Sequence, residues 1–319
     1  MINSDLLPWS EKYRPKNLSE VVGQSEIVST LKAFVSSKNI PNLLFSGSPG
    51  VGKTTCAVAL ARELYGDNFS GNFLELNASD DRGIDVVRGK IKDFARTSSI
   101  GDAPFKLIFL DESDALTADA QQALRRTMEA SSSVTRFILS ANYSSRIIEP
   151  IQSRCAVFRF SPLTEANVFA LIDHISKSEK LHINDEAKKA IYYVCEGDLR
   201  KAVNVLQGAA MQSKTITAEL VHKISSKATP KEIKEMVDLS IAGNFLKARE
   251  KLDHLLINYG LSAEDVLIQT YREIPNLTVS EKRKMKLVEA VAEANFRLIS
   301  GANDRIQLEA LIAKFALSE

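Results

Sequence analysis

The stretch NLLFSGSPGVGKTT (residues 42–55) decides the fold, because it joins an apolar, strand-like run to a helix through a glycine-rich turn. Its central part, GSPGVGKT (47–54), matches the phosphate-binding pattern G-x-x-x-x-G-K-[ST] in full. In such a loop backbone amides turn inward around phosphate oxygens, the lysine (Lys53) reaches the terminal phosphates and the hydroxyl (Thr54) can hold Mg²⁺. A glycine-rich turn before an ordinary helix is the alternative, but the complete match and its flanks favour nucleotide binding. The residues expected to contact the nucleotide here are Gly47, Ser48, Pro49, Gly50, Val51, Gly52, Lys53, Thr54 and Thr55.

Strand-like and helical patterns alternate around this loop up to about residue 161. Near-continuous apolar runs predict strands at 42–47, 72–79, 105–113, 135–142 and 155–160. Helical spacing of apolar residues predicts intervening helices at 52–66, 83–97 and 118–130. Apolar strands that alternate with helices indicate a parallel sheet covered on both faces. The fold class expected for residues 1–161 is therefore α/β.

Beyond Pro162 the pattern becomes helical. Helices are predicted at 164–180, 183–197 and 198–212, with Thr164 and Asn184 as N-caps and Gly197 as a stop signal. A polar, proline-bearing break at 225–232 precedes further helices that run to the end of the sequence. We therefore predict three domains: an α/β nucleotide-binding domain at 1–161, a small helical domain at 162–226 and a helical domain at 227–319.

The composition is that of a soluble globular protein, with 45% hydrophobic and 25% charged residues among 319. The formal net charge of +1 does not by itself demand nucleic acid or lipid as a partner. Three widely separated cysteines without a C-x-x-C pair argue against a zinc site or a disulfide framework and favour a reducing, intracellular environment. No run approaches the ~18 apolar residues of a membrane helix and the start lacks a signal-peptide pattern, so we expect a cytoplasmic protein with no membrane partner.

Two carboxylates end the strand-like run in LIFLDESD (107–114). Ligands of open α/β sheets bind at the carboxyl ends of the strands, which is where Asp111 and Glu112 fall. Asp111 suits Mg²⁺ coordination, and Glu112 suits polarising the water that attacks the γ-phosphate. An acidic turn that merely ends a strand is the alternative. About sixty residues after a phosphate-binding loop, the carboxylates favour an ATPase.

Two further polar residues are candidates to sense the γ-phosphate. Asn142 ends the strand-like run FILSAN, so its amide could hold the attacking water or the γ-phosphate, or could simply end the strand. Arg200 lies near the start of a helix in the second predicted domain, where a solvated surface arginine is the alternative.

With these motifs in order, the chain resembles the AAA+ ATPases and, within them, the archaeal form of the replication factor C small subunits, which are clamp-loader subunits. The resemblance covers essentially the whole chain. Its marks are WSEKYRPKNLSEVVGQ (9–24), NIPNLLFSGSPGVGKTT (39–55), ELNASDDRG (75–83), APFKLIFLDESDALTADAQQALRRTMEA (103–130), SANYSSRIIEPIQSRCAVFRF (140–160), GDLRKAVNVLQ (197–207) and GANDRIQLEALIA (301–313). Two departures, Ser113 for the usual alanine and Ala141 for a cysteine, leave every catalytic group in place.

The resemblance implies an assembly of one replication factor C large subunit and four small-subunit copies. That assembly uses ATP and Mg²⁺ to open a PCNA-type sliding clamp and load it onto primer–template DNA during replication. The helical segment 162–226 would be a lid, and 227–319 a collar that closes the pentamer. The expected location is cytoplasmic and nucleoid-associated, or nuclear in a eukaryote.

The resemblance also gives Arg154, in Ser153-Arg154-Cys155, the role of an arginine finger that reaches ATP bound by the neighbouring subunit in trans. A guanidinium can contact γ-phosphate oxygens bidentately. A surface arginine paired with a helix carboxylate is the alternative. Arg200 would contact phosphate within its own subunit and couple nucleotide state to domain closure.

For the adenine base, the resemblance indicates Tyr13, Arg14 and Pro15 with Val21 and Val22. A plain extended segment is the alternative for the Tyr-Arg-Pro sequence, because residues before proline avoid helix.

For DNA, the resemblance indicates Arg82 and Arg88, which would follow the duplex backbone. A solvated helix of mixed charge is the alternative. The following loop, TSSIGDAPF (97–105), would touch the clamp through Ile100 and Phe105, or Phe105 would instead start the core strand. Arg125 and Arg126 are candidates for a subunit interface or for a helix surface.

Two other classes of protein compete with a clamp loader. A different AAA+ machine, such as a branch-migration helicase, would form hexamers and unwind DNA. A non-hydrolysing structural subunit is disfavoured, because Lys53, Asp111 and Glu112 are all present.

Overall fold

The protein is represented by a computed structural model that describes residues 7–80, 87–97, 99–225 and 230–318. The chain divides into two compact units, Met1–His182 with Ile191–Gln207 and Ile183–Ala190 with Gly208–Glu319. The division into three domains that the sequence suggests remains a prediction. No helix of the described segments is long and apolar enough to span a bilayer.

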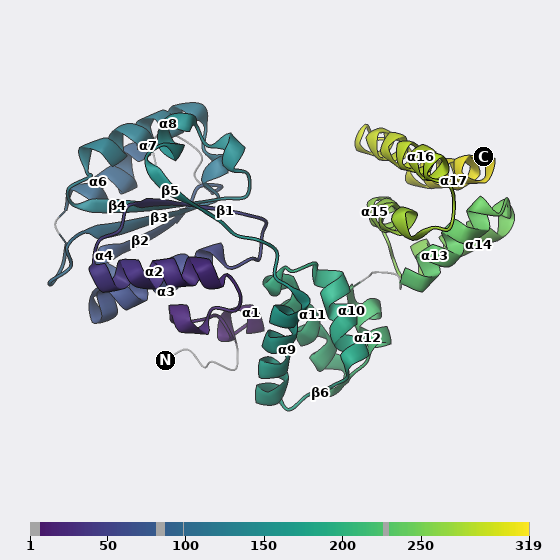
Figure 1. Ribbon diagram of the computed structural model, residues 1–319, viewed down its shortest axis with the longest axis horizontal. Coiled ribbons are helices and arrows are strands. Elements are labelled where there is room, and N and C mark those ends of the chain that lie inside the picture. Colours follow the sequence, from purple (N-terminus) through teal and green to yellow (C-terminus); the bar gives the residue numbers. More distant parts are fainter. Residues whose placement is uncertain (1–6, 81–86, 98, 226–229, 319) are drawn as a thin grey trace. The chain divides into compact units, whose positions relative to one another are not determined.

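A five-stranded parallel sheet forms the centre of the first unit (Figure 1). Its strands are β1 (Asn42–Ser46), β2 (Phe73–Asn77), β3 (Lys106–Asp111), β4 (Thr135–Ala141) and β5 (Cys155–Arg159). They lie in the order β2-β3-β4-β1-β5. The predicted parallel α/β fold is therefore confirmed, and each predicted strand is present with slightly shorter ends.

Helices cover both faces of this sheet, with α2 and α3 on one face and α7 and α8 on the other (Figure 1). The described helices of this α/β region are α1 (Trp9–Lys12), α2 (Ser25–Ser37), α3 (Lys53–Tyr65), α4 (Phe69–Asn72), α6 (Lys92–Arg96), α7 (Ala118–Ala130) and α8 (Glu149–Gln152). In α7 the buried Ala120, Leu124 and Met128 recur every four residues, which is the spacing of one helical face. The sequence did not lead us to expect α2, which buries Val28 and Leu31 among polar residues.

Further helices follow the sheet. They are α9 (Glu165–Glu179), α10 (Asp185–Cys195), α11 (Leu199–Gln212) and α12 (Ala218–Ser225), with two short strands, β6 (His182–Ile183) and β7 (Thr215–Ile216). Both predicted N-caps are confirmed, since Thr164 accepts a hydrogen bond from the Asn167 amide and Asn184 accepts one from the Ala187 amide. Of the helix predicted at 83–97, the described part is a π-helical turn, Val87–Ile91, that continues into α6.

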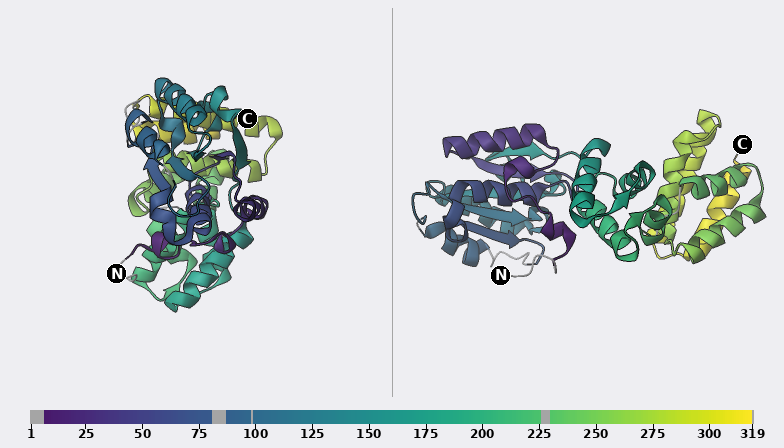
Figure 2. Two further views of the ribbon diagram at one scale, coloured as in Figure 1. Left: turned by 90° about the vertical axis from the view of Figure 1, so that its left-hand side faces the viewer. Right: turned by 90° about the horizontal axis from the view of Figure 1, so that it is seen from below.

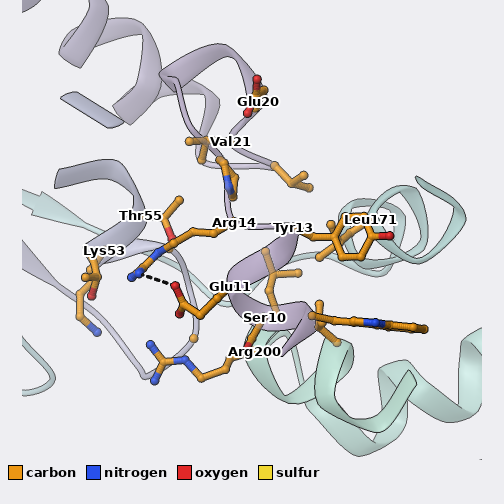
Figure 3. A pocket seen from close by; sticks show the side chains of 18 of the residues that line it. Ser10, Glu11, Tyr13, Arg14, Glu20, Val21, Lys53, Thr55, Leu171 and Arg200 are labelled. Atoms are coloured by element: carbon orange, nitrogen blue, oxygen red, sulfur yellow. Dashed lines mark hydrogen bonds and ion pairs between the residues drawn. The ribbon is translucent and has the colours of Figure 1, made fainter. Parts of the chain in front are cut away.

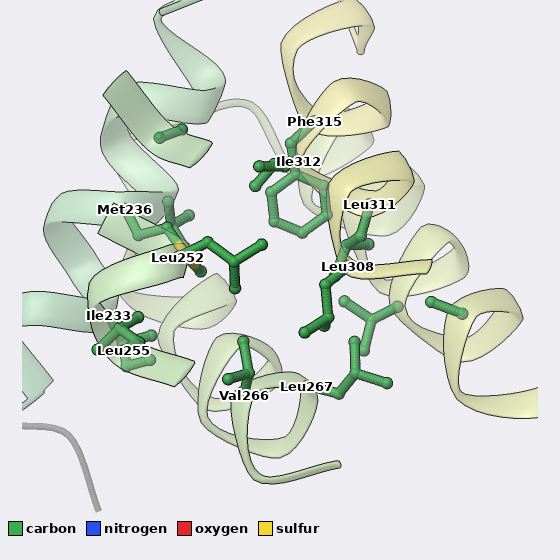
Figure 4. Packing of buried hydrophobic residues seen from close by; sticks show 14 of the residues in the cluster. Ile233, Met236, Leu252, Leu255, Val266, Leu267, Leu308, Leu311, Ile312 and Phe315 are labelled. Carbon is green, nitrogen blue, oxygen red and sulfur yellow. The ribbon is translucent and has the colours of Figure 1, made fainter. Parts of the chain in front are cut away.

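The C-terminal helices pack on one another around a continuous apolar core (Figures 1, 2 and 4). They are α13 (Pro230–Ile241), α14 (Phe245–Asn258), α15 (Ala263–Glu273), α16 (Glu281–Ile299) and α17 (Asp304–Leu317). Figure 4 shows Met236 of α13 and Leu252 of α14 converging with Leu308 and Phe315 of α17. Burial of these amphipathic faces explains why the segments fold as helices.

The sheet brings the predicted site residues to one edge. Ser46 at the end of β1 is in register with Ala141 at the end of β4, and Leu110 of β3 is in register with Leu139 of β4. The phosphate-binding loop, Asp111 and Asn142 therefore follow adjacent strands at the carboxyl edge, which is where such sheets bind ligands.

Candidate functional site

A cavity of about 730 Å³ lies at this edge of the sheet, within the first unit (Figure 3). The phosphate-binding loop, the ends of β3 and β4, the N-terminal segment and helices α9 and α11 contribute to its walls. The predicted site residues that line it are Tyr13, Arg14, Pro15, Val21, Val22, Pro49, Gly50, Gly52, Lys53, Thr54, Thr55, Asp111, Glu112, Asn142 and Arg200. Segments as distant in sequence as residues 13 and 200 therefore meet at one site.

Lys53 is the first residue of α3, directly after the loop, and is only 7% exposed. Its Nζ donates hydrogen bonds to the carbonyl oxygens of Gly47 (2.6 Å) and Ser48 (2.8 Å) and to Oδ1 of Asn142 (3.0 Å). Burial lowers the pKa of the Lys53 ammonium, and the charge of Asp111 partly opposes that shift. The lysine is thus fixed beside the loop, with Asn142 as a direct partner.

Thr54 and Asp111 form the second polar pair of the site. The Thr54 hydroxyl donates to Oδ2 of Asp111 at 2.7 Å, and the Glu112 amide donates to Oδ1 of the same carboxylate at 2.9 Å. Hydroxyl and carboxylate oxygens are ligands that Mg²⁺ prefers, so this pair fits the predicted magnesium site.

Glu112 has an unusual backbone. Its φ of 51° places a non-glycine residue in the left-handed region, while its side chain is exposed and lines the cavity. Such a conformation costs on the order of 1–3 kcal/mol and is found often at functional sites. Glu112 thus lies in the turn that directly follows β3, next to Asp111 and within the lining of the cavity.

Asp114 holds the turn that carries Asn142, a role that the sequence analysis did not predict. Its carboxylate oxygens accept hydrogen bonds from the amides of Asn142 (3.3 Å) and Tyr143 (3.2 Å). The acidic run after β3 therefore fixes the end of β4 as well as providing Asp111 and Glu112. The sequence signal that could have indicated this role is the position of Asp114, three residues after Asp111 in the same acidic run.

The phosphate-binding loop contacts the start of α11 directly. Gly50 has a φ of 71°, a backbone conformation that favours glycine. A Cβ at this position would also lie 1.8 Å from Oδ1 of Asp198, so both the backbone and the available space require glycine. The Leu199 amide donates to the Gly50 carbonyl at 3.0 Å. These contacts place Arg200, the next residue, in the cavity. Sequence reasoning identified Arg200 but not the Asp198 contact that positions it.

The N-terminal segment forms another part of the wall, where a hydrogen bond and an aromatic contact hold Tyr13. The Tyr13 hydroxyl donates to Oε1 of Glu179 at 2.5 Å, and its ring meets the His174 ring edge-on. Burial, reinforced by the Glu179 hydrogen bond, raises the pKa of the Tyr13 hydroxyl. Leu171, His174 and Val203 also line the cavity and were not predicted, because their sequence pattern is that of ordinary helix faces.

Other predicted residues lie outside the lining of the cavity. Gly47 and Ser48 contribute the carbonyls that bind Lys53, and Val51 is buried. Arg82 lies outside the described residues, and of Arg88 only the backbone, in the π-helical turn, is described.

Arg154 also lies away from the cavity of its own chain. Its guanidinium forms an ion pair with Glu129 at 2.7 Å and donates to the Pro150 carbonyl at 2.7 Å. Glu129 is shared with Arg125, at 2.9 Å. In the single chain Arg154 therefore pairs with a helix carboxylate, and its action on a neighbouring subunit remains a prediction.

Comparisons with known proteins agree with this geometry. The model of the AAA family, "ATPase family associated with various cellular activities", matches residues 43–163, and the model "Replication factor C C-terminal domain" matches residues 228–314. The chain is 61% identical over 312 residues to a replication factor C small subunit of Methanococcus maripaludis, covering 98% of this chain and 99% of that one. The chain belongs to the replication factor C small subunit family.

More distant members of the family support the same assignment. The replication factor C small subunit of Methanocella arvoryzae is 55% identical over 97% of this chain and 96% of its own length. That of Archaeoglobus fulgidus is 54% identical over 96% of both chains. These relatives confirm the resemblance drawn from the motifs, and they place the chain in an ATPase family associated with DNA replication.

Solved structures show the fold in another protein. The Thermotoga maritima RuvB Holliday junction branch migration motor matches with a TM-score of 0.56 and 18% identity, covering 81% of this chain and 91% of that one. At this identity the similarity concerns the fold alone.

Proposed function

We propose that this replication factor C small subunit binds and hydrolyses ATP, and that the assembly containing it opens a PCNA-type clamp and loads it onto primer–template DNA. The observation that carries the proposal is the convergence of Lys53, the Thr54–Asp111 pair, Asn142 and Arg200 on one cavity. Such groups suit the binding of a triphosphate and attack on it by water.

Each polar group of the cavity has a distinct task in this proposal. The loop amides and Lys53 bind the phosphates, and Thr54 and Asp111 hold Mg²⁺. Bound Mg²⁺ would neutralise charge on the phosphate oxygens. Glu112 orients and polarises the attacking water, while Asn142 and Arg200 contact the γ-phosphate. Tyr13, Val21, Val22 and the backbone of Arg14 enclose the base, and the Arg14 guanidinium, which points toward Thr55 and Lys53, reaches the phosphates (Figure 3).

Arg154 completes the site of a neighbouring subunit in trans. Its guanidinium lies at the surface of the chain, 40% exposed and paired with Glu129, which supports a role in contacting an anionic partner. On assembly with the large subunit and further copies of this chain, phosphate oxygens replace Glu129 as that partner. The pairing with Glu129 keeps the charge of the finger neutralised until then.

The loop before β3 is the surface that we propose for clamp contact. The fully buried side chain of Asn72 binds both backbone polar groups of Ile100 in this loop. Its Nδ2 donates to the Ile100 carbonyl (2.9 Å), and its Oδ1 accepts from the Ile100 amide (2.8 Å). Ile100 is 53% exposed, whereas Phe105 is buried. Phe105 therefore belongs to the core, and Ile100 is the apolar side chain left for the clamp.

The test is the rate of ATP hydrolysis by this chain mixed with a large subunit, with and without the clamp and primed DNA. Stimulation by both together is expected. An equal rate under all conditions would contradict clamp loading and leave only the ATPase.

Arg82 and Arg88 are the residues that we propose for binding the DNA backbone. The double variant Arg82→Ala, Arg88→Ala should keep basal hydrolysis and lose stimulation by primed DNA, because each arginine neutralises phosphate charge without reading bases. Retained stimulation in that variant would exclude these two arginines from DNA binding.

We further propose that the assembly acts in the cytoplasm, associated with the nucleoid.

A further inference from the structure

A half-exposed carboxylate lines the cavity that we propose for the nucleotide. Glu11, on the short helix α1, lines this cavity together with Arg14, Lys53 and Arg200. Its Oε2 is 3.0 Å from Nη1 of Arg14. Figure 3 shows the Arg14 guanidinium reaching toward Thr55 and Lys53, with Glu11 directly beside it and Arg200 below. An acidic side chain thus lies among the cations that would bind an anion.

Contacts on either side of Glu11 hold α1 in place. The Trp9 amide donates to Oε1 of Gln207 at 3.0 Å, which ties the start of α1 to α11. At the other end, Lys12 Nζ and the Tyr13 hydroxyl both donate to Oε1 of Glu179 on α9, at 2.8 and 2.5 Å. The backbone of Glu11 therefore cannot leave the cavity without breaking contacts to two helices.

We propose that Glu11 competes with the nucleotide for Arg14 and so sets the affinity for ATP. Phosphate oxygens that enter the cavity replace Glu11 as the ion-pair partner of Arg14, because both groups are anions that bind the same guanidinium. The Glu11 carboxylate then remains near the phosphates as an uncompensated like charge, which weakens binding. The inference rests on the proposed nucleotide binding, and it identifies a residue of the chain that opposes it.

A carboxylate at this position suits an ATPase cycle, which must release its product. A cavity of cations alone would bind ADP more tightly, whereas a resident carboxylate returns to Arg14 as the nucleotide leaves. Glu11 lowers the affinity for both nucleotides, since both bring phosphates to the cation that it occupies.

The test is calorimetric titration of the full-length chain with Mg·ATP and with Mg·ADP. The variant Glu11→Gln keeps the shape and removes the charge, and its Kd should fall at least about threefold for both nucleotides. Glu26→Gln is the matched control, since Glu26 is an exposed carboxylate on α2 outside the cavity lining, and its Kd should equal that of the parent. A Kd for Glu11→Gln that is unchanged or higher would overturn the proposal.

A second variant tests whether Glu11 acts through Arg14. In the background Arg14→Gln, adding Glu11→Gln should improve affinity by clearly less than it does in the parent, as a double-mutant cycle measures. A gain of the same size in both backgrounds would overturn competition for Arg14. Failure of the parent chain itself to bind ATP would count against the proposed function, whereas binding by the parent with no gain in Glu11→Gln counts against this inference alone.

Discussion

The edge of the sheet and the C-terminal helical bundle use buried space in opposite ways. At the sheet edge, the buried or half-buried polar groups Lys53, Thr54, Asp111 and Asn142 are paired with one another around a cavity. In the bundle, a continuous core of aliphatic side chains and Phe315 fills the space between five helices. The first region holds polar groups in a fixed arrangement where a ligand can replace their partners, and the second gains its stability from apolar packing.

This contrast predicts that the two regions respond differently to substitution. A change at the sheet edge should alter binding or catalysis with little effect on folding. A change in the core of the bundle should alter folding and leave nucleotide affinity as it was. Substitutions in the nucleotide site and in the bundle should therefore be followed by both activity and unfolding measurements.

Arg154→Ala should have the largest effect. In the assembly with a large subunit, kcat should fall about 10³-fold or more, because the guanidinium that stabilises charge on the transferred phosphoryl group is lost. ATP binding by the variant chain should be retained, since Arg154 lies outside its own cavity. Single-turnover hydrolysis and nucleotide titration measure the two quantities. Arg159→Ala, an exposed arginine on β5, is the control, and loss of binding together with hydrolysis would refute a role in trans.

Phe315→Ala should have the largest effect on stability. Phe315 is 1% exposed in the core of the bundle, and removal of such a ring costs about 3–5 kcal/mol in free energy of unfolding. Denaturant unfolding gives that quantity, and nucleotide titration should show unchanged affinity. Phe296→Ala is matched in chemistry but 71% exposed, so its unfolding free energy should change by less than about 0.5 kcal/mol. Equal destabilisation by the two would contradict the assigned core.

Lys53→Ala should reduce the affinity for ATP by about 10²-fold or more, by removing the cation nearest the terminal phosphates. Folding stability at pH 7 should not fall, because burial already lowers the pKa of this ammonium and so disfavours the charged form in the folded chain. This cost in folding free energy is complete at pH values below the pKa of Lys53 in the folded chain. It fades as the pH rises toward the pKa of the unfolded chain, near 10.5. Calorimetry and thermal unfolding of Lys53→Ala beside the exposed control Lys32→Ala separate the two effects.

Loss of the Tyr259 hydrogen bond, in the helical bundle, should have the smallest effect on stability. Its hydroxyl donates to Glu232 at 2.7 Å, and this hydrogen bond, with burial, raises the pKa of Tyr259 to about 12. The folded pKa lies above the unfolded value of 10.0, so the contact stabilises fully below pH 10 and is lost as pH rises toward 12. The difference in phenolate absorbance between the parent and Tyr259→Phe reports this titration. A step near pH 10 would show that the hydrogen bond is absent.

Much of the sheet edge could be predicted from sequence because its determinants are local. The loop at 47–54 has fixed spacing, and Asp111, Glu112 and Asn142 each end an apolar run, so their strands bring them together. The helices of the bundle were predictable for the same reason, through the spacing of their apolar residues.

The remaining features depend on contacts between distant segments. The need for glycine at position 50 comes partly from Asp198, about 150 residues away, and Leu171, His174 and Val203 look like ordinary helix residues until α9 and α11 reach the cavity. Helix α2 was missed because it buries few residues. The pairing of Arg154 with Glu129 depends on how α7 lies beside the turn after α8, which spacing alone cannot give.

In the proposed mechanism each ATP is bound by one subunit, and its hydrolysis requires the arginine of the next. The direct measurement compares single-turnover ATP hydrolysis by the isolated chain, verified as a monomer by sedimentation, with hydrolysis by the same chain assembled with a large subunit. The monomer should bind ATP but cleave it about 10³-fold more slowly than the assembly does. A monomer that cleaves ATP as fast as the assembly would contradict this mechanism.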